Sequence, residues 1–578
     1  ENGGITVDFS TEIGDLTFRS ITGYRESKVD NENEDIDYSA ADAIGNQRYL
    51  TDIDTFTQEF RLSGTNGAMD WLVGAFYYDE SIYFESDIDF GTQWRNYANI
   101  LVGGSPAAGE AVIGGLEALL GYPTGTFFEP GTGVLEMATM DNETMSVFGQ
   151  ASFDLTSRTQ LTLGFNYLDD EKDVGISQIN DDAFSKLALD GTDGATALTN
   201  AGFLGAFPSA FAATFGLPFT PDNAALVGSS PAGAAGLQQL QAGVLGQVAA
   251  AVAMADLSDP TQNPFLGLQA LQFLPQMLEL PNAADDGTSA DEKFTYTASI
   301  NHEFSDQLNV YLTYATGYKA TSWNLSRDTR PTQGEYDALV SAGVALPNNL
   351  TIGTRLAGPE ESEVLELGIK YNAQWGYINA AFFNQTIEGF QSNVFTGAGF
   401  NLANAGEQSV DGVEVDVMLR PTERLSLGVS GTYLDPFYDA FVGANVGGAA
   451  EDLSGTKPGG IPELTLSLIG SYDFTIMGMD AWIQADYRYD KEVDIQDGGD
   501  QSATNILLET TGSRTREVGL LNASVGIAKN GWEFRVWGRN LTNDEYLITW
   551  FPSVAQTGSF SGYPNQPRMW GASIRKSF

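Results

Sequence analysis

Cysteine is absent from the 578-residue chain, and histidine occurs only once, at His302. Without thiolates or a second imidazole, the sequence offers no disulfide, no cysteine nucleophile and no histidine metal cluster. His302 lies beside an expected turn, where an interfacial or lumen position is a better interpretation than a catalytic base. With 76 acidic residues, paired carboxylates carry no information about catalysis. We therefore expect no enzyme activity, no cofactor and no metal centre.

Basic residues are scarce, since 28 Lys and Arg face 76 Asp and Glu and give a formal net charge of -48. Nucleic-acid binding needs a basic surface, so we expect no nucleic-acid partner. The acidic run 30–37 has alternating oxygen donors that could hold calcium. It lacks the glycine and the terminal glutamate of an EF-hand loop, so a solvated acidic loop is the preferred interpretation. Acidic loops could also bind divalent ions that bridge lipopolysaccharide phosphates.

Long apolar runs are missing as well. A transmembrane helix needs roughly 18 or more apolar residues, and the nearest approach, 242–257, is shorter and is interrupted by Gln247. The chain opens with Glu1-Asn2-Gly3-Gly4, which has neither the basic nor the apolar region of a signal peptide. We expect an exported chain that is mature, processed or incomplete at its amino end.

The sequence does contain segments in which apolar residues alternate with polar or small residues, with a period of two. In the final segment, 567–578, Trp570, Ala572 and Ile574 share one face and polar or small residues share the other. A soluble sandwich edge strand could show the same pattern, but it recurs along the chain. It is repeated in the segments 161–167, 365–371, 413–419, 481–489 and 521–527. Apolar groups facing lipid and polar groups facing a lumen are typical of an outer-membrane barrel strand.

The connections between these segments alternate between short and long. Short turns are expected near 12–15, 64–70, 156–159, 305–307, 372–376, 421–424, 476–480 and 529–531. Long loops are expected at 28–55, 85–137, 170–291, 322–359, 391–407, 436–461, 490–515 and 543–562. Short periplasmic turns and long extracellular loops predict an all-β transmembrane antiparallel barrel with about 17 strands in this chain. Because bacterial barrels have an even number of strands, we expect at least one upstream strand outside it.

Two of the long loops, 85–137 and 170–291, are large insertions into the barrel domain. The segments 106–120, 237–257 and 266–278 are predicted to form short helices. Apolar helices on an extracellular loop need a partner, which could be each other, a hydrophobic ligand or a neighbouring protein. We expect residues 170–291 to fold over the barrel mouth or to dock on a surface or outer-membrane protein.

Aromatic residues in the extracellular loops are the candidates for contacting a small-molecule ligand, because aromatic faces stack on sugars, catecholates and corrin-like rings. The alternative for each is packing in the aromatic girdle or within a loop. The candidates are Trp94, Tyr97, Tyr318, Trp323, Trp550 and Phe551. Inward arginines are predicted to line the lumen and to contact a plug or ligand, namely Arg420, Arg488, Arg535 and Arg539.

Several segments together resemble one family, the TonB-dependent outer-membrane receptors. They are 20–25, 58–62, 310–319, 366–370, 404–414, 537–546 and 567–578, the last ending at Phe578. The resemblance implies a 22-stranded barrel with an amino-terminal plug that binds the TonB complex. It implies that residues 1–578 are part of that barrel, that the plug and first strands lie outside this sequence, and that Phe578 is the barrel-assembly residue.

The resemblance also implies a function and a location. We expect an outer-membrane receptor of a Gram-negative bacterium for active uptake of a scarce nutrient. Ferric siderophores are the family's commonest cargo, and a saccharide or an apolar compound stays open because the acidic exterior should repel anionic chelates. The alternatives are a passive porin-like channel and a structural surface-assembly protein.

Overall fold

The computed structural model describes residues 1–272, 274, 276, 278–326, 330–346, 350, 352, 353, 355–395, 399–446, 449–497, 514–554 and 559–578. One 17-stranded antiparallel sheet dominates the described part of the chain. Its strands are β1 (Asn2–Ile13), β2 (Leu16–Asp35), β3 (Ile44–Asn66), β4 (Met69–Phe90), β5 (Gly133–Thr156), β6 (Thr159–Asn180), β7 (Thr288–Glu303), β8 (Leu308–Lys319), β11 (Glu360–Ala373), β12 (Gly376–Glu388), β15 (Glu407–Thr422), β16 (Leu425–Ala440), β19 (Leu464–Ile476), β20 (Met479–Asp494), β21 (Thr515–Lys529), β22 (Trp532–Arg539) and β25 (Met569–Lys576).

The predicted alternation of short and long connections is confirmed. Consecutive strands pair through short turns at one end of the sheet, as in the two residues between β21 and β22. There Asn530 and Gly531 both have positive φ, 49° and 77°. A two-residue hairpin turn that matches the strand twist needs this conformation, which Asn-Gly adopts readily. The long connections all lie at the other end, because each strand of an antiparallel hairpin reverses direction.

Within the described residues, four small pairs of antiparallel strands lie in the long connections. They are β9 (Ser322–Trp323) with β10 (Leu356–Ala357), β13 (Gln391–Phe395) with β14 (Phe400–Asn404), β17 (Val442–Val446) with β18 (Ala449–Asp452), and β23 (Leu547–Pro552) with β24 (Phe560–Pro564).

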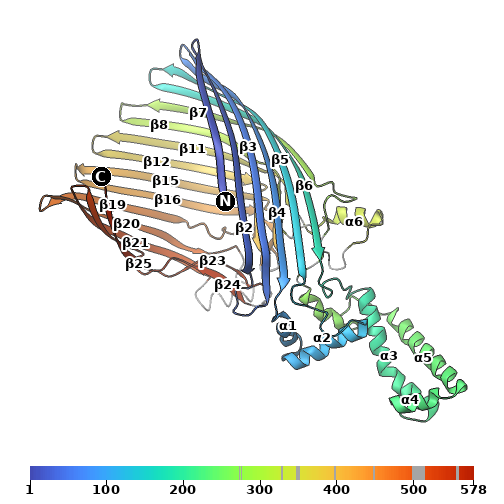
Figure 1. The fold of residues 1–578 in the computed structure, drawn as a ribbon. Helices are drawn as coiled ribbons and strands as arrows, with labels where there is room; N and C mark the ends of the chain where they lie inside the picture. Colours follow the sequence, from blue (N-terminus) through green and yellow to red (C-terminus); the bar gives the residue numbers. More distant parts are fainter. Residues whose placement is uncertain are drawn as a thin grey trace.

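The sheet curves into a trough with two open edges (Figure 1). Within the described residues, β1 pairs only with β2, and β25 pairs only with β22. Residues 4–12 therefore do not hydrogen-bond to 567–578, and these 17 strands do not close on themselves. An open edge presents unpaired backbone N–H and C=O groups, which a membrane cannot satisfy.

The two faces of the sheet differ as the alternation predicts. Large apolar side chains stay exposed on the outer face, with Leu163 46%, Leu365 49% and Ile483 48% exposed. Their neighbours in sequence are polar and point to the hollow side of the trough. An exposed apolar face of this extent is expected of a lipid-facing barrel wall. The fold class expected from the sequence, an antiparallel outer-membrane-type β sheet, is therefore confirmed.

The first strands of the sheet are longer than the sequence suggested. Strands β2 to β6 have 20 to 24 residues, about twice what a tilted strand needs to cross the hydrocarbon core. The expected loops 28–55, 85–137 and 170–291 therefore begin later and end earlier. On the outward face of β4, the apolar and aromatic residues end at Tyr77 and the next residue on that face is Asp79, so the strand continues beyond the lipid. Polar residues on both faces made these extensions resemble loops.

Helices occur only in the long connections of the described chain. They are α1 (Trp94–Gly103), α2 (Pro106–Leu120), α3 (Thr192–Phe215), α4 (Pro221–Gly228), α5 (Pro231–Val252), η1 (Pro264–Leu271) and α6 (Gln333–Ser341). Among the described residues, none of these helices combines the length and apolarity needed to cross a membrane. The predicted helix 106–120 is α2, and 237–257 overlaps α5. The predicted helix 266–278 is wrong at the described residues 272, 274, 276 and 278, and the other residues past 272 in that range lie outside the described part. Helices α1, α3, α4 and α6 were not foreseen.

A loop core joins the base of these helices to the ends of the long strands. It contains Phe90, Trp94, Ile113, Phe128 and Phe184, each at most 1% exposed. The segment around Leu268 and Leu271 packs into the same core. Beyond it, α3, α4 and α5 lean away from the sheet (Figure 1). The expectation that residues 170–291 fold over the mouth is therefore wrong for this hairpin, because α3 and α5 bury their phenylalanines against each other.

Candidate ligand-binding surfaces

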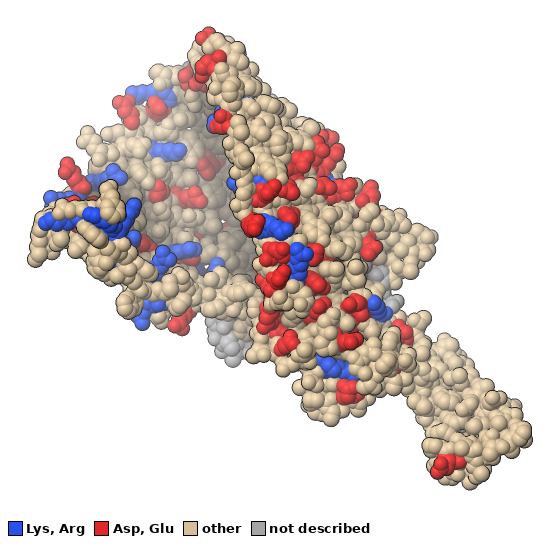
Figure 2. Space-filling view, in the orientation of Figure 1, with Lys and Arg blue, Asp and Glu red and all other residues tan. Residues whose placement is uncertain are grey.

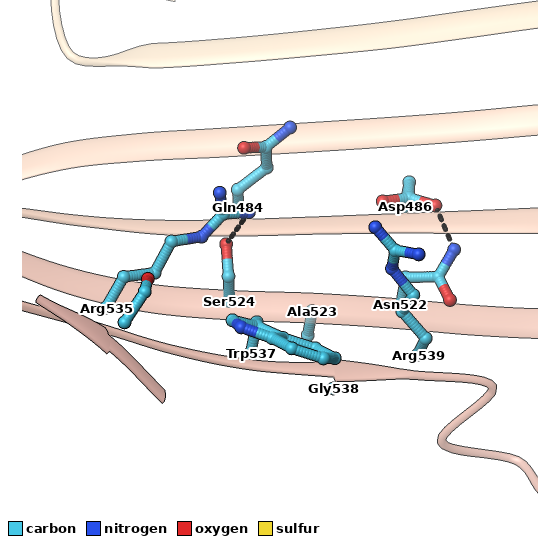
Figure 3. A pocket seen from close by; sticks show the side chains of 10 residues that line it. Gln484, Asp486, Asn522, Ala523, Ser524, Arg535, Trp537, Gly538 and Arg539 are labelled. Atoms are coloured by element: carbon cyan, nitrogen blue, oxygen red, sulfur yellow. Dashed lines mark hydrogen bonds between the residues drawn. The ribbon is translucent and has the colours of Figure 1, made fainter. Parts of the chain in front are cut away.

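A polar hollow of about 390 Å³ lies on the inner face of the last strands, shown in Figure 3. It is built from alternate residues of β20, β21, β22 and β25, whose intervening residues form the lipid-facing series. The lining side chains come from Gln484, Asp486, Asn522, Ser524, Arg535, Trp537, Arg539 and Ser573. Two arginines, two amides, two hydroxyls and one carboxylate give the hollow both donors and acceptors.

Neighbouring strands hold the arginines of this hollow in place. Arg535 donates from Nη2 to Ser524 Oγ at 3.1 Å, and Asn522 Nδ2 donates to Asp486 Oδ2 at 2.7 Å. The Arg539 guanidinium lies 5.6 Å from the centre of the Trp537 ring, within cation–π range. Arg535 Nε is buried without a hydrogen-bond partner among the described residues. Donor capacity therefore remains for an anionic group entering the hollow.

The structure brings only part of the predicted arginine set together. Arg535 and Arg539 share the hollow. Arg488, on the adjacent β20, forms an ion pair with Asp490 at 2.8 Å. Arg420 lies apart, at the short-turn end of β15, where its backbone N–H donates to the Trp375 carbonyl at 2.6 Å. These four residues do not form one site. That they line the lumen stays a prediction.

Trp94 and Tyr97 belong to the loop core. The Trp94 ring stacks on Phe90 with centroids 5.2 Å apart, and it packs against Tyr97 at 5.5 Å. Trp94 is 1% exposed, so its ring offers no surface to a ligand in this conformation. Tyr97 is half-buried beside it. These contacts favour the loop-packing alternative for Trp94.

Trp323 is held in a second small core. It is 8% exposed and packs with Phe84, Val174 and Leu280, and its indole N–H donates to Ser289 Oγ at 3.0 Å. Tyr318 lies nearby at the loop end of β8, half-buried, with Glu361 as its partner in register on β11. Neither residue lines the arginine hollow.

Trp550 and Phe551 lie on β23, and they differ in exposure. Trp550 is 7% exposed and packs with Ile495 and Phe560. Phe551 instead contacts Tyr38 and Tyr563, with ring centroids at 5.3 and 5.8 Å. Tyr38 and Tyr563 are 52% and 48% exposed, so these three rings form an accessible aromatic group at the rim. Sequence reasoning missed both tyrosines, although each lies in or next to an expected long loop.

The remaining candidates have simple surroundings. His302 Nδ1 lies 2.9 Å from Thr159 Oγ1 beside the turn between β7 and β8, as an interfacial residue would. The acidic run 30–37 is mostly the end of β2, not the solvated loop expected. Asn33 has a positive φ of 57°, which interrupts the regular alternation, and the Asn31 amide donates to Glu34 Oε1 at 2.8 Å. Phe578 is fully exposed at the chain end, and its assembly role stays a prediction.

Comparison with known proteins shows the relatives of this chain. Residues 267–541 match the family model described as TonB dependent receptor-like, beta-barrel. No curated protein sequence matches the chain. Among solved structures, the fold is similar to the ferric yersiniabactin uptake receptor FyuA from Yersinia pestis, with a TM-score of 0.60 and 13% identity over 100% of this chain and 61% of that one.

Two further structures share the fold. The siderophore receptor PiuA from Acinetobacter baumannii has a TM-score of 0.55 and 15% identity over 99% of this chain and 63% of its own. The copper transporter OprC has a TM-score of 0.54 and 11% identity over 100% of this chain and 66% of its own. The chain thus spans about three fifths of the length of the first two structures.

The family match and the shared sheet architecture agree with the lipid-facing outer face of the sheet. Both point to an outer-membrane location. Residues 267–541, just under half of the chain, thus match the β-barrel of TonB-dependent receptors, and the whole chain shares the fold of solved outer-membrane receptors.

Proposed function

We propose that this chain forms the wall of a receptor that takes up a ferric siderophore across the outer membrane, driven through the TonB complex. The observation that carries the proposal is the arginine hollow on the inner face, lined by Arg535 and Arg539. In a chain of net charge -48, inward arginines give an anionic chelate a local counter-charge. The solved relatives named for siderophore uptake support the same cargo class.

The open edges β1 and β25 support a proposal about the complete receptor. Strands outside this sequence pair with both edges, and a plug occupies the hollow side, where it faces the same arginines. Residues 1–578 then form one barrel domain with the two insertions at 85–137 and 170–291. Pairing with further strands satisfies the edge N–H and C=O groups inside the membrane.

A test of transport uses the receptor gene with the rest of its coding sequence intact. Deleting the gene should abolish growth on the cognate ferric siderophore under iron limitation, and removing TonB should have the same effect. Energy-independent uptake or sustained ion conductance would instead indicate a passive porin. If the deletion leaves the uptake of iron chelates unchanged but abolishes the uptake of a saccharide or an apolar compound, the proposed cargo is wrong and the proposed transport mechanism stands.

The role of the hollow is tested separately. Replacing Arg535 or Arg539 by Gln should weaken binding of an anionic chelate by about 10- to 100-fold, and replacing both should weaken it by at least about 100-fold, since hydrogen bonds to charged groups are worth about 1.5–3 kcal/mol each. Arg420→Gln is the matched control, because it removes an inward-series arginine outside the hollow. Equal effects of both changes would mean that the hollow is not a binding site.

A further inference from the structure

The hairpin of α3 and α5 packs on itself and touches the body only at its base. Its internal core consists of Phe207, Phe211 and Val244, with partly buried neighbours from α3, α4, α5 and the connection between α3 and α4. At the base, Ala197 enters the loop core and the Asn200 amide donates to the Leu119 carbonyl at 2.7 Å. Past Asn200 the helices project away from the sheet (Figure 1). Their outer surface has no cover among the described residues.

That outer surface is apolar and almost without charge. Leu204 is 64% exposed, Leu245 43% and Met254 83%. Between Asp193 and Asp256 the only charged residue is Asp222. Figure 2 shows the hairpin as a neutral surface with one acidic spot near its tip, whereas the face of β2 to β6 carries many carboxylates. Exposed apolar area costs about 25 cal/mol per Å², so a partner that covers this surface is favoured.

We propose that the partner is a second copy of the same chain, docked hairpin to hairpin. Charge is the first argument. Two chains of net charge -48 repel each other, and the hairpin is where they can meet without opposing carboxylates. The 15 residues of α3 past Asn200 span about 22 Å, between two and three Debye lengths of about 8 Å at physiological salt. Contact along this projecting part keeps the acidic bodies largely screened from each other.

Self-complementary chemistry is the second argument. Gln238, Gln241 and Leu245 follow one another along an exposed ridge of α5. A glutamine amide both donates and accepts, so two identical ridges can satisfy each other, which two carboxylate or two ammonium surfaces cannot do. A Cβ added at Gly243 or Gly246 would meet no atom within 4 Å, so the helix surface there is open to close approach.

The available area fits a small interface between copies. The 15 residues of α3 past Asn200 are about 22 Å long, so a strip about 20 Å wide across two helices covers roughly 450 Å² per copy, a little over half of the roughly 800 Å² per partner of a standard interface. The two-fold pairing of identical surfaces makes a closed dimer, and it does not depend on the proposed cargo.

The absence of cysteine from residues 1–578 makes a direct test possible in intact cells, with any cysteine elsewhere in the complete receptor replaced by serine. Gln241→Cys and Leu245→Cys are introduced singly into the complete receptor and oxidised. We expect a disulfide-linked species of twice the receptor mass from both variants. Val442→Cys, at a site 77% exposed in another long connection, is the matched control and should stay monomeric. Labelling of each thiol with a maleimide, together with unchanged barrel mobility on unheated gels, confirms folding and access.

A second variant tests the apolar contact itself. Adding Leu204→Arg to Gln241→Cys should lower the linked fraction at least about tenfold, because an unpaired charge in a dry interface is costly. Monomeric receptor from both cysteine variants despite full maleimide labelling would overturn the proposal. So would cross-linking of the hairpin to a different protein, which would make the surface a docking site for a foreign partner.

Discussion

The hydroxyl groups of Tyr38 and Tyr563 lie 2.6 Å apart although 525 residues separate them in the chain. Tyr38 follows β2, next to the open edge formed by β1, and Tyr563 is in β24, between β22 and the other edge strand, β25. Phe551 packs against both rings. The loop core crosses the same seam, because Val554 packs in a cluster with Ala43 and Ile44. Loops therefore join the two edges at the extracellular rim, although β1 and β25 do not pair with each other.

The seam contact should be measurable by a double-mutant cycle. Tyr563→Phe and Tyr38→Phe each remove the hydroxyl bond and keep the ring contacts. Each should lower the local opening free energy of residues 36–43 by about 1 kcal/mol, and the double variant by no more than the larger single effect. Hydrogen exchange of that segment gives the value. Additive losses would mean that the two hydroxyls do not interact.

This contact also predicts an alkaline limit. Burial, together with the Tyr563 hydroxyl, raises the pKa of Tyr38 to about 12 from its ordinary value of 10.0. The pKa of Tyr38 is higher in the folded state than in the unfolded state. The stabilisation from this contact is therefore fully present below pH 10 and is lost as pH rises through about 12. Hydrogen exchange of 36–43 at pH 9 and pH 11 should show the loss. Tyr38→Phe, which does not titrate, should show none of it.

The buried carboxylate of Glu117 should be essential to the 91–132 connection. It is 0% exposed, it pairs with Arg95 at 2.9 Å, and it accepts the backbone N–H groups of Phe127 at 2.8 Å and Gly125 at 3.0 Å. Glu117→Ala leaves the backbone N–H groups of Phe127 and Gly125 without this acceptor and leaves Arg95 with only Glu110 and the Phe127 carbonyl as partners. We therefore expect the connection to lose about 3 kcal/mol of local stability. Limited proteolysis between α2 and β5 should accelerate more than 100-fold. Glu110→Ala, whose side chain is 41% exposed, should change the rate far less.

Asp89 should make the base of the loop core sensitive to pH. It lies at the loop end of β4, beyond the lipid-facing series, and burial beside Asp87 and Asp181 raises its pKa from 3.8 to about 6. The folded state therefore binds the proton more tightly, and stability falls as pH rises from about 4 to about 6. Because solvent screens this partly exposed group, Asp89→Asn should raise the free energy of unfolding by about 1 kcal/mol at pH 7 and should leave it unchanged at pH 4. Stabilisation that is equal at both pH values would contradict this assignment.

The hairpin should be separable from the loop core. Deleting 203–254 removes the exposed parts of α3 and α5 but spares Ala197, Leu268 and Leu271, which pack in the loop core. We expect the heat stability of the barrel to stay unchanged. The larger deletion of 195–285 removes all three and should destabilise the connections 91–132 and 181–287, as judged by proteolysis. Equal destabilisation by both deletions would show that the hairpin supports the core.

The sequence determined the wall of the sheet because alternation acts locally. Leu365 and Leu367 are exposed on the outer face, as their spacing predicts, since successive side chains in a strand point to opposite sides. Asn530-Gly531 fixed a turn for the same local reason, through the backbone angles that these two residues adopt. Strand number, loop polarity and lipid-facing residues therefore followed from neighbours in the chain.

The rim was decided by tertiary structure. No local pattern distinguishes Trp94, which is buried among Phe90 and Phe128, from Tyr38, which is exposed against Tyr563. Which aromatic is covered depends on which distant loop folds over it, and the 578-residue chain offers many combinations. Which sides of α3 and α5 are buried was also decided by tertiary structure. Neither helix carries a charged stripe, so only their mutual packing shows which side is left for a partner. Local spacing sets the face of a strand, whereas the burial of a loop residue is set by contacts hundreds of residues away.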